Sequence, residues 1–137
     1  MSLNEPDPER RPPPPAAPSV LIVDDDETLR GQLATYLDSH GIQCLVARDG
    51  TEALEILKAQ WFDAVLLDVR LPDMSGLEVA ARICQASPRP KIVLMSGYDD
   101  AVSEAKRAKL EVFSVIEKPV PLWYVARALD QALDLVA

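Results

Sequence analysis

The sequence predicts an α/β fold with a five-stranded parallel sheet and helices on both of its faces. After residue 18, short apolar runs alternate five times with segments of helical periodicity. Unbroken apolar runs are typical of parallel strands, because both faces of such strands are covered. Right-handed crossovers then place helices on both faces, and the strand order 2-1-3-4-5 is usual at this size.

The composition indicates one globular domain with a real core. The chain has 137 residues, of which 48% are hydrophobic, and its formal net charge is −8. This charge disfavours direct binding of nucleic acid or of an acidic membrane surface. The sequence has no apolar run of membrane-spanning length and no signal-peptide core, so we expect a cytoplasmic protein. We expect Cys44 and Cys84 to be buried, reduced thiols and His40 to lie on the surface.

Residues 1–18 are predicted to form a disordered, proline-rich tail, and residues 19–137 to form the folded domain. Seven of the twelve prolines lie in the tail, four of them in succession at 12–15. Such a run favours the extended polyproline II conformation and does not pack a core. Alternatively, the prolines and the neighbouring arginines at 10 and 11 could form the ligand of an adaptor protein.

The first half of the domain contains two predicted strands and two predicted helices. Residues 20–23 form the first strand, and a helix follows over residues 27–39. One face of that helix carries an apolar stripe made of Leu29, Leu33, Tyr36 and Leu37. Gly41 suits the C-terminal end of the helix. Residues 43–47 form a less apolar strand, which we place nearer an edge of the sheet, and a helix runs from about 51 to 59.

The third strand contains four successive apolar residues, 64–67, and ends on Asp68. It spans residues 62–68, and a turn-rich loop follows over residues 71–76. The next helix spans residues 76–85, and its inner face is predicted to be Leu77, Ala80, Ala81 and Cys84. The fourth strand lies within residues 91–96.

The last part of the chain contains two helices around the fifth strand. The helix that runs to about residue 110 from Asp99 or Asp100 turns only small apolar side chains inward, so we expect it to be the least firmly docked. The strand spans residues 112–116, and the final helix begins with Pro121 as its first residue. Its neighbours Trp123 and Tyr124 cannot both face the core. One of them is therefore an exposed anchor, or else lies against the neighbouring helix.

Three carboxylates are predicted to converge at the carboxyl edge of the sheet. Asp24 and Asp25 follow the first strand and Asp68 ends the third, and these strands are neighbours in the predicted order. Adjacent carboxylates repel one another, so all three stay ionised only with a cation present. Oxygen ligands without histidine or cysteine select Mg²⁺ or a similar ion. Alternatively, the first two acids only favour the start of a helix and the third caps a turn.

Two further polar side chains follow strands at the same edge. Ser96 ends the fourth strand and Lys118 follows the fifth. A carboxylate nucleophile, a divalent metal, a lysine and a hydroxyl together suit phosphoryl transfer to Asp68. The alternatives are a solvated lysine and a turn serine. No glycine-rich loop follows the first strand, which excludes the usual dinucleotide or P-loop site.

Four motifs occur in order along the chain: VLIVDDDETLR, DAVLLDVRLPDMSG, VLMSG and IEKP. Together they resemble the receiver domain of two-component response regulators, the CheY-like family, from about residue 19 to residue 136. The resemblance implies the flavodoxin-like (βα)5 fold with strand order 2-1-3-4-5. It also implies a signalling protein rather than an enzyme, whose only chemistry is self-phosphorylation from a phosphodonor and autodephosphorylation.

The resemblance implies a role for each residue at this edge. Asp68 is the phosphoacceptor, Ser96 moves toward the phosphoryl group, and Lys118, followed by a cis bond to Pro119, binds that group. The Mg²⁺ ion is held directly by Asp25 and mainly through water by Asp24. Asp68 and the backbone carbonyl of Arg70 are its further ligands.

The resemblance also implies the partners. The phosphoryl group comes from a histidine kinase or a phosphotransfer protein, and it repacks the face made of the fourth helix, fifth strand and last helix. That face controls an output domain, a partner or a homodimer. Alternative functions are a phosphorylation-independent interaction module and, least favoured, an Asp-nucleophile phosphohydrolase, which needs an acid where Arg70 stands. The chain is either a stand-alone receiver or part of a larger regulator.

Several residues depart from the family pattern. Val115 occupies the position of an aromatic residue that swings inward on activation, and Phe113 lies two residues earlier, on the same predicted strand face. Arg70 and Tyr98 are bulky at two positions to which the family's dephosphorylation rate responds. We expect these two side chains to crowd the attacking water and to lengthen the lifetime of the phosphorylated form.

Overall fold

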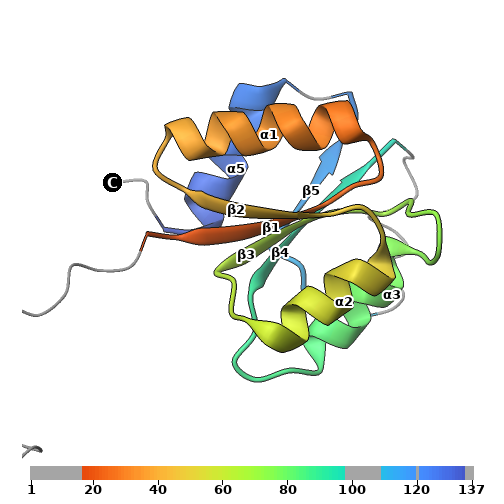
Figure 1. Ribbon diagram of the computed structural model, residues 1–137. Coiled ribbons are helices and arrows are strands. Elements are labelled where there is room, and N and C mark those ends of the chain that lie inside the picture. Colours follow the sequence, from red (N-terminus) through yellow and green to blue (C-terminus); the bar gives the residue numbers. More distant parts are fainter. Residues whose placement is uncertain (1–16, 98–108, 120, 135–137) are drawn as a thin grey trace, which may run out of the picture.

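A computed structural model describes residues 17–97, 109–119 and 121–134. Most of the predicted tail and nearly all of the predicted fourth helix, together with Tyr98, lie outside the described residues. The elements are labelled as in Figure 1, in which the label α4 is not used.

Five parallel strands form a single sheet in the order β2-β1-β3-β4-β5, which confirms the predicted fold. The less apolar second strand lies at an edge, as expected. The strands are β1 (Ser19–Val23), β2 (Gln43–Ala47), β3 (Ala64–Asp68), β4 (Lys91–Ser96) and β5 (Ser114–Glu117). The helices are α1 (Glu27–Ser39), α2 (Gly50–Ala59), α3 (Gly76–Cys84) and α5 (Leu122–Ala132).

Helices cover both faces of the sheet. Figure 1 shows α1 and α5 on one face and α2 and α3 on the other. Successive residues of a strand point to opposite faces, so β1 contributes to two separate cores. Val20 and Ile22 pack with α1 and α5, whereas Leu21 and Val23 pack with α2 and α3. The central strand β3 is buried along its whole length.

Three of the four helices begin with a side-chain cap that satisfies a free backbone N–H group. Asp26 accepts from Leu29 N–H at the start of α1, Asp49 caps α2, and Ser75 caps α3. The prediction for the last helix was wrong by one residue. Pro121 is the residue before α5, with an extended backbone at ψ 148°, and the helix begins at Leu122.

The buried face of α3 differs from the predicted one. Its fully buried side chains include Val79 and Ile83, whereas Leu77, Ala81 and Cys84 are only half-buried. Glu78 and Arg82, four residues apart, mark the outer face of the helix, and the buried side chains lie opposite them; the predicted face was centred too far to one side. Ala80 is buried, as predicted.

Other boundaries and exposures also differ from the predictions. The third strand begins at residue 64, and the buried Phe62 lies just before it. Both Trp123 and Tyr124 are exposed on α5, where their rings meet edge to face at 5.8 Å. The two cysteines are free, but they are half-buried rather than buried. His40 lies on the surface at the end of α1, as expected.

None of the helices in the described residues combines the length and apolarity needed to cross a membrane.

Candidate functional site

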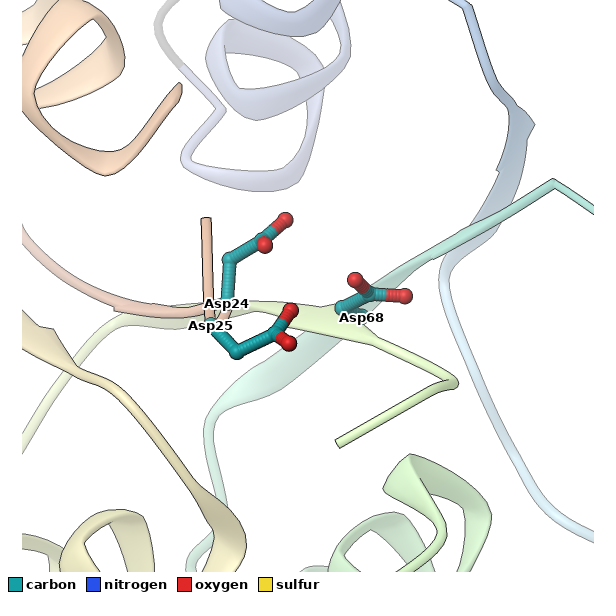
Figure 2. A group of neighbouring side chains, drawn as sticks. All are labelled: Asp24, Asp25 and Asp68. Carbon is teal, nitrogen blue, oxygen red and sulfur yellow. The ribbon is translucent and has the colours of Figure 1, made fainter. Parts of the chain in front are cut away.

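Three carboxylates meet at the carboxyl edge of the sheet, where β1 and β3 end side by side (Figure 2). One ligand oxygen from each of Asp24, Asp25 and Asp68 lies within 4.8 Å of the others. Asp24 and Asp68 are buried, at 0% and 6% exposure, while Asp25 is exposed. The acidic cluster is thus buried at Asp24 and Asp68 and open to solvent at Asp25. An all-oxygen donor set of this kind fits a hard divalent cation such as Mg²⁺, which keeps several of its waters.

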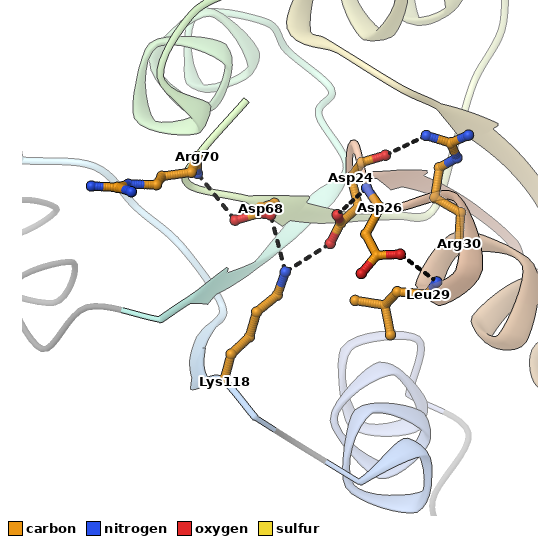
Figure 3. Close-up of polar contacts among 7 residues, drawn as sticks. All are labelled: Asp24, Asp26, Leu29, Arg30, Asp68, Arg70 and Lys118. Carbon is orange, nitrogen blue, oxygen red and sulfur yellow. Dashed lines mark hydrogen bonds and ion pairs between the residues drawn. The ribbon is translucent and has the colours of Figure 1, made fainter. Parts of the chain in front are cut away.

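The ammonium group of Lys118 lies between two of these carboxylates (Figure 3). Its Nζ is 2.9 Å from Oδ2 of Asp24 and 3.0 Å from Oδ2 of Asp68. The lysine follows β5 directly, its N–H donates to the carbonyl of Ser96 at 2.7 Å, and its bond to Pro119 is cis. The fold therefore brings a fixed positive charge onto Asp68 from a strand two positions away in the sheet.

Ser96 is buried at the end of β4, between the strand that carries Asp68 and the strand that leads to Lys118. Met95 pairs with Asp68 across the sheet, and Ser96 pairs with Glu117. Ser96 therefore lies at the same edge as the acids, as the sequence predicted.

The loop after β3 is closed tightly over Asp68. The N–H of Arg70 donates to Oδ1 of Asp68 at 3.0 Å, and the N–H of Gly76 donates to the carbonyl of Val69 at 2.7 Å. A Cβ added at Gly76 would collide with the carbonyl oxygen of Asp68 and lie 2.9 Å from its carbonyl carbon. Only glycine allows this approach, which fixes the position of the Arg70 backbone relative to Asp68. The side chain of Arg70 points outward and is exposed.

The residues after β1 divide their roles. Oδ1 of Asp24 accepts from Asp26 N–H at 2.9 Å, and its carbonyl accepts from Nη1 of Arg30 at 2.9 Å. Asp26 caps α1, which is the helix-start role that the sequence left open for these acids. Arg30 was not predicted as part of the site. Arg30 ends the motif VLIVDDDETLR, but its contact with Asp24 depends on the turn between β1 and α1 and so could not be inferred from the motif.

The buried charges shift one another's protonation. Burial raises the pKa of Asp68 above its ordinary value, the Arg70 N–H and Lys118 oppose that shift, and the charge of Asp24 adds to it. Burial by itself lowers the pKa of Lys118, but its bonds to Asp24 and Asp68 raise it overall. Lys118 therefore stays charged at neutral pH. A divalent cation beside Asp68 would favour its ionised form.

A fourth acid, Asp73, was also missed in the sequence. It lies in the loop after β3 and accepts hydrogen bonds from the first turn of α2, from Gly50 N–H at 2.9 Å and Thr51 N–H at 2.8 Å. The Thr51 hydroxyl donates to the same carboxylate at 2.6 Å. These bonds lower the pKa of Asp73 to about 2, the Thr51 hydroxyl contributing most. They tie the loop that begins at Asp68 to the start of α2.

The family model of the response regulator receiver domain matches residues 20–130. The chain is 35% identical over 101 residues to the positive alginate biosynthesis regulatory protein of Pseudomonas aeruginosa, covering 74% of this chain and 40% of that one. It is 42% identical over 108 residues to the autoinducer 1 sensor kinase/phosphatase LuxN of Vibrio campbellii, covering 79% and 13% respectively. The chain thus spans less than half of either relative.

Solved structures agree with these sequence matches. A CheY-like receiver domain from Methanospirillum hungatei has a TM-score of 0.80 at 25% identity, covering 87% of this chain and 95% of that one. The response regulator TrrA from Thermotoga maritima, solved in complex with Mg²⁺-BeF, has a TM-score of 0.76 at 28% identity, covering 85% and 99%. Family model, relatives and fold agree, and the chain belongs to the response regulator receiver domain family.

Proposed function

We propose that this chain is a phosphorylation switch that accepts a phosphoryl group on Asp68 in a Mg²⁺-dependent reaction. The observation that carries the proposal is the convergence of three carboxylates and Lys118 at one edge of the sheet. We assign the Mg²⁺ ligands to Asp24, Asp25 and Asp68, with the backbone carbonyl of Arg70 completing the protein's share. The ion, when bound, neutralises charge on the transferring phosphoryl oxygens.

In the proposed reaction, a carboxylate oxygen of Asp68 attacks the phosphorus of the donor. A new P–O bond forms as the bond from phosphorus to the leaving group breaks, and the electron pair of that bond stays with the leaving group. Asp68 enters ionised and therefore needs no base. Lys118, already 3.0 Å from Asp68, meets the negative charge that arrives with the phosphoryl group. Ser96 supplies a hydroxyl donor from the neighbouring strand.

We infer that the signal leaves the site through β5. Phosphorylation adds about −1.5 to −2 charge. Lys118 and Ser96 respond to that charge, and both are connected to β5. Lys118 directly follows the last residue of the strand, and Ser96 pairs with that residue, Glu117. The far end of β5, Ser114, borders a hollow of about 270 Å³ that Trp123 and Tyr124 of α5 also line. Val115 of β5 is smaller than the aromatic residue usual in the family, so we assign the coupling to movement of the strand rather than of one ring.

We propose a histidine kinase or phosphotransfer protein as the phosphodonor, and an output domain or a second copy as the receiver of the signal. The family membership and the match to a sensor kinase/phosphatase support this assignment. The surface that we propose for the output comprises β5 and α5, together with the predicted fourth helix. We expect the reaction to take place in the cytoplasm, with no catalytic turnover of an external substrate.

The test is the intact mass of the protein after incubation with acetyl phosphate, with and without Mg²⁺. We expect one phosphoryl adduct in the wild type only when Mg²⁺ is present, and none in Asp68→Asn. Asp38→Asn, at an exposed acid on α1, is the matched control and should be phosphorylated normally. An adduct on Asp68→Asn, or none on a folded wild type, would contradict the proposal. The second outcome would favour a phosphorylation-independent interaction module.

A further inference from the structure

An exposed tryptophan lies at the amino edge of the sheet, opposite the acidic site. Trp61 stands between α2 and β3, and it is 51% exposed. Its indole N–H donates to Oδ1 of Asp63 at 3.3 Å. The other oxygen of Asp63 accepts from the N–H of Ser19 at 2.9 Å. A single carboxylate thus connects Trp61 to the residue at which the proline-rich segment enters β1.

Two hollows of about 290 Å³ each meet at this tryptophan. Both are lined by Gln60, Trp61 and Phe62, so they adjoin at these residues, and we call the two hollows together the Trp61 groove. The near half is bordered by Ser19, Gln43 and Leu45, and Leu45 is itself 45% exposed. The far half runs between α2 and α3 and is mostly apolar, with basic side chains at its border. Its walls include Leu54, Leu57, Pro88, Pro90, Lys58 and Arg82.

The chain enters the sheet beside this groove. The carbonyl of Pro18 accepts from the N–H of Gln43 at 2.8 Å, and Gln43 borders the near half. Pro12–Pro15 precede Ser19 by four to seven residues. At about 3.1 Å per residue in polyproline II, these prolines reach roughly 12–22 Å from Ser19. The prolines are therefore tethered close to the near half of the groove, which Ser19 itself borders.

Shape is the main argument for this segment as the occupant. Polyproline segments bind grooves lined by aromatic side chains, because the extended helix is formed in advance and little order is lost. Residues 5–15 carry three acids and two bases (Glu5, Asp7 and Glu9 against Arg10 and Arg11), a net charge of −1, and the border of the far half carries the basic Lys58 and Arg82. A short tether supplies an effective concentration of about 1 mM, so even weak contacts suffice for docking.

We propose that the proline-rich segment, residues 5–15, docks in the Trp61 groove of its own chain. The groove is then an intramolecular binding site at the edge of the sheet opposite Asp68. This proposal does not depend on phosphorylation of Asp68.

The test uses the full chain with one tryptophan left as the reporter. The chain has two tryptophans and three tyrosines, so in Trp123→Phe, excited at a wavelength that tyrosine does not absorb, the emission comes from Trp61. We compare acrylamide quenching in this background with quenching after Pro12–Pro15 are all replaced by serine, which keeps the length. An effective concentration of about 1 mM docks at least half of the segments if their affinity is about 1 mM or tighter. Acrylamide should then quench Trp61 in the serine variant about twice as strongly as in the chain that keeps its prolines. Its emission maximum should also shift to the red.

The matched control is Trp61→Phe, in which Trp123 on α5 is the reporter. Replacing the prolines should leave its quenching unchanged, because α5 lies away from the groove. Equal quenching of Trp61 with and without the prolines would overturn the proposal and leave the groove to another protein. Protection that grows with protein concentration, together with a doubled mass, would also overturn it, since the occupant would then belong to a second copy.

Discussion

The ammonium nitrogen of Lys118 lies 3.0 Å from Oδ2 of Asp68, although 50 residues separate the two in the chain. The same nitrogen also lies 2.9 Å from Asp24, whose side chain is completely buried. Without a metal ion in the cluster, this lysine is the cation that offsets the repulsion among the acids.

We therefore expect Lys118→Met to lower the free energy of unfolding in the absence of Mg²⁺. Removing one partner of a buried ion pair leaves a buried charge, and the lysine side chain is only 25% exposed, so the loss should be about 3 kcal/mol. Mg²⁺ should raise the Tm of the variant more than that of the wild type, because the ion replaces the missing charge. Thermal unfolding with and without Mg²⁺ measures both effects.

The control for that experiment is Lys58→Met, since Lys58 is exposed and pairs with Glu55 only at 3.8 Å. Its stability should change by less than about 1 kcal/mol. If Lys118→Met were as stable as this control without Mg²⁺, the lysine would not be neutralising the acids.

Gly76→Ala should destabilise the protein and slow phosphorylation of Asp68. The added Cβ would collide with the backbone of Asp68, and backbone cannot move aside as a flexible side chain can. Overpacking of this kind costs about 1–3 kcal/mol. Urea unfolding measures the stability, and adduct formation from acetyl phosphate measures the rate. Unchanged values of both would mean that the loop after β3 can move away from Asp68 freely.

Gly31→Ala should have the opposite effect and serves as the matched glycine substitution. Gly31 lies on the exposed side of α1, and no atom lies within 4 Å of a Cβ built there. Alanine in a helix interior is more favourable than glycine by about 1 kcal/mol, so the variant should be more stable by that amount. The same urea unfolding measures it, and phosphorylation should be unaffected. A loss of stability would contradict the open space found around Gly31.

Asp73→Asn should lower stability at neutral pH, and the difference from wild type should shrink in acid. The folded-state pKa of Asp73 is about 2, below its ordinary value of 3.8. Its ionised form therefore stabilises the fold fully above the unfolded pKa, and this contribution is lost as the pH falls from about 4 toward 2. Urea unfolding at pH 7, 5 and 3.5 measures the trend.

The control for Asp73 is Glu55→Gln in α2, whose carboxylate is exposed and 3.8 Å from Lys58. This change should alter stability at pH 7 by no more than about 0.5 kcal/mol. If the Asp73→Asn difference stayed constant down to pH 3.5, the hydrogen bonds to Gly50 and Thr51 would not depend on the charge of Asp73.

A phosphoryl analogue should change the fluorescence of Trp123 and not that of Trp61. Trp123 borders the hollow at the far end of β5, whereas Trp61 lies at the opposite edge of the sheet from Asp68. Beryllofluoride with Mg²⁺ should therefore shift the emission of Trp61→Phe and leave that of Trp123→Phe unchanged. A shift of both tryptophans would indicate a change throughout the domain, and a shift of neither would contradict signalling through β5.

Much of this architecture could be predicted from the sequence because it depends on local patterns. Apolar runs specify the strands, and parallel order brings their ends to one edge, so Asp24, Asp68 and Lys118 could be placed together before any contact was known. Their mutual distances could not, because these depend on side-chain conformations within the folded site.

Most of the features that were missed depend on contacts between distant segments. Asp73 resembles any polar loop residue until the start of α2 is placed against it, 22 residues away in the chain. The inner face of α3 could have been predicted from the sequence, because Glu78 and Arg82 mark its outer side and Val79 and Ile83 lie opposite them. The exposure of both Trp123 and Tyr124, by contrast, follows from the docking of α5, not from its periodicity.

The contact between Asp24 and Lys118 joins residues 94 positions apart and therefore has a consequence for synthesis. A ribosome adding about 5–20 residues per second needs about 2.5–10 s to proceed from Asp68 to Lys118. During that time the growing chain carries its acids but lacks their lysine, and β4 lacks its neighbour β5. A partly made chain thus contains Asp24 and Asp68 without the lysine that offsets their charge. The proposed switch is therefore complete in a new molecule only once β5 has been translated and has paired with β4.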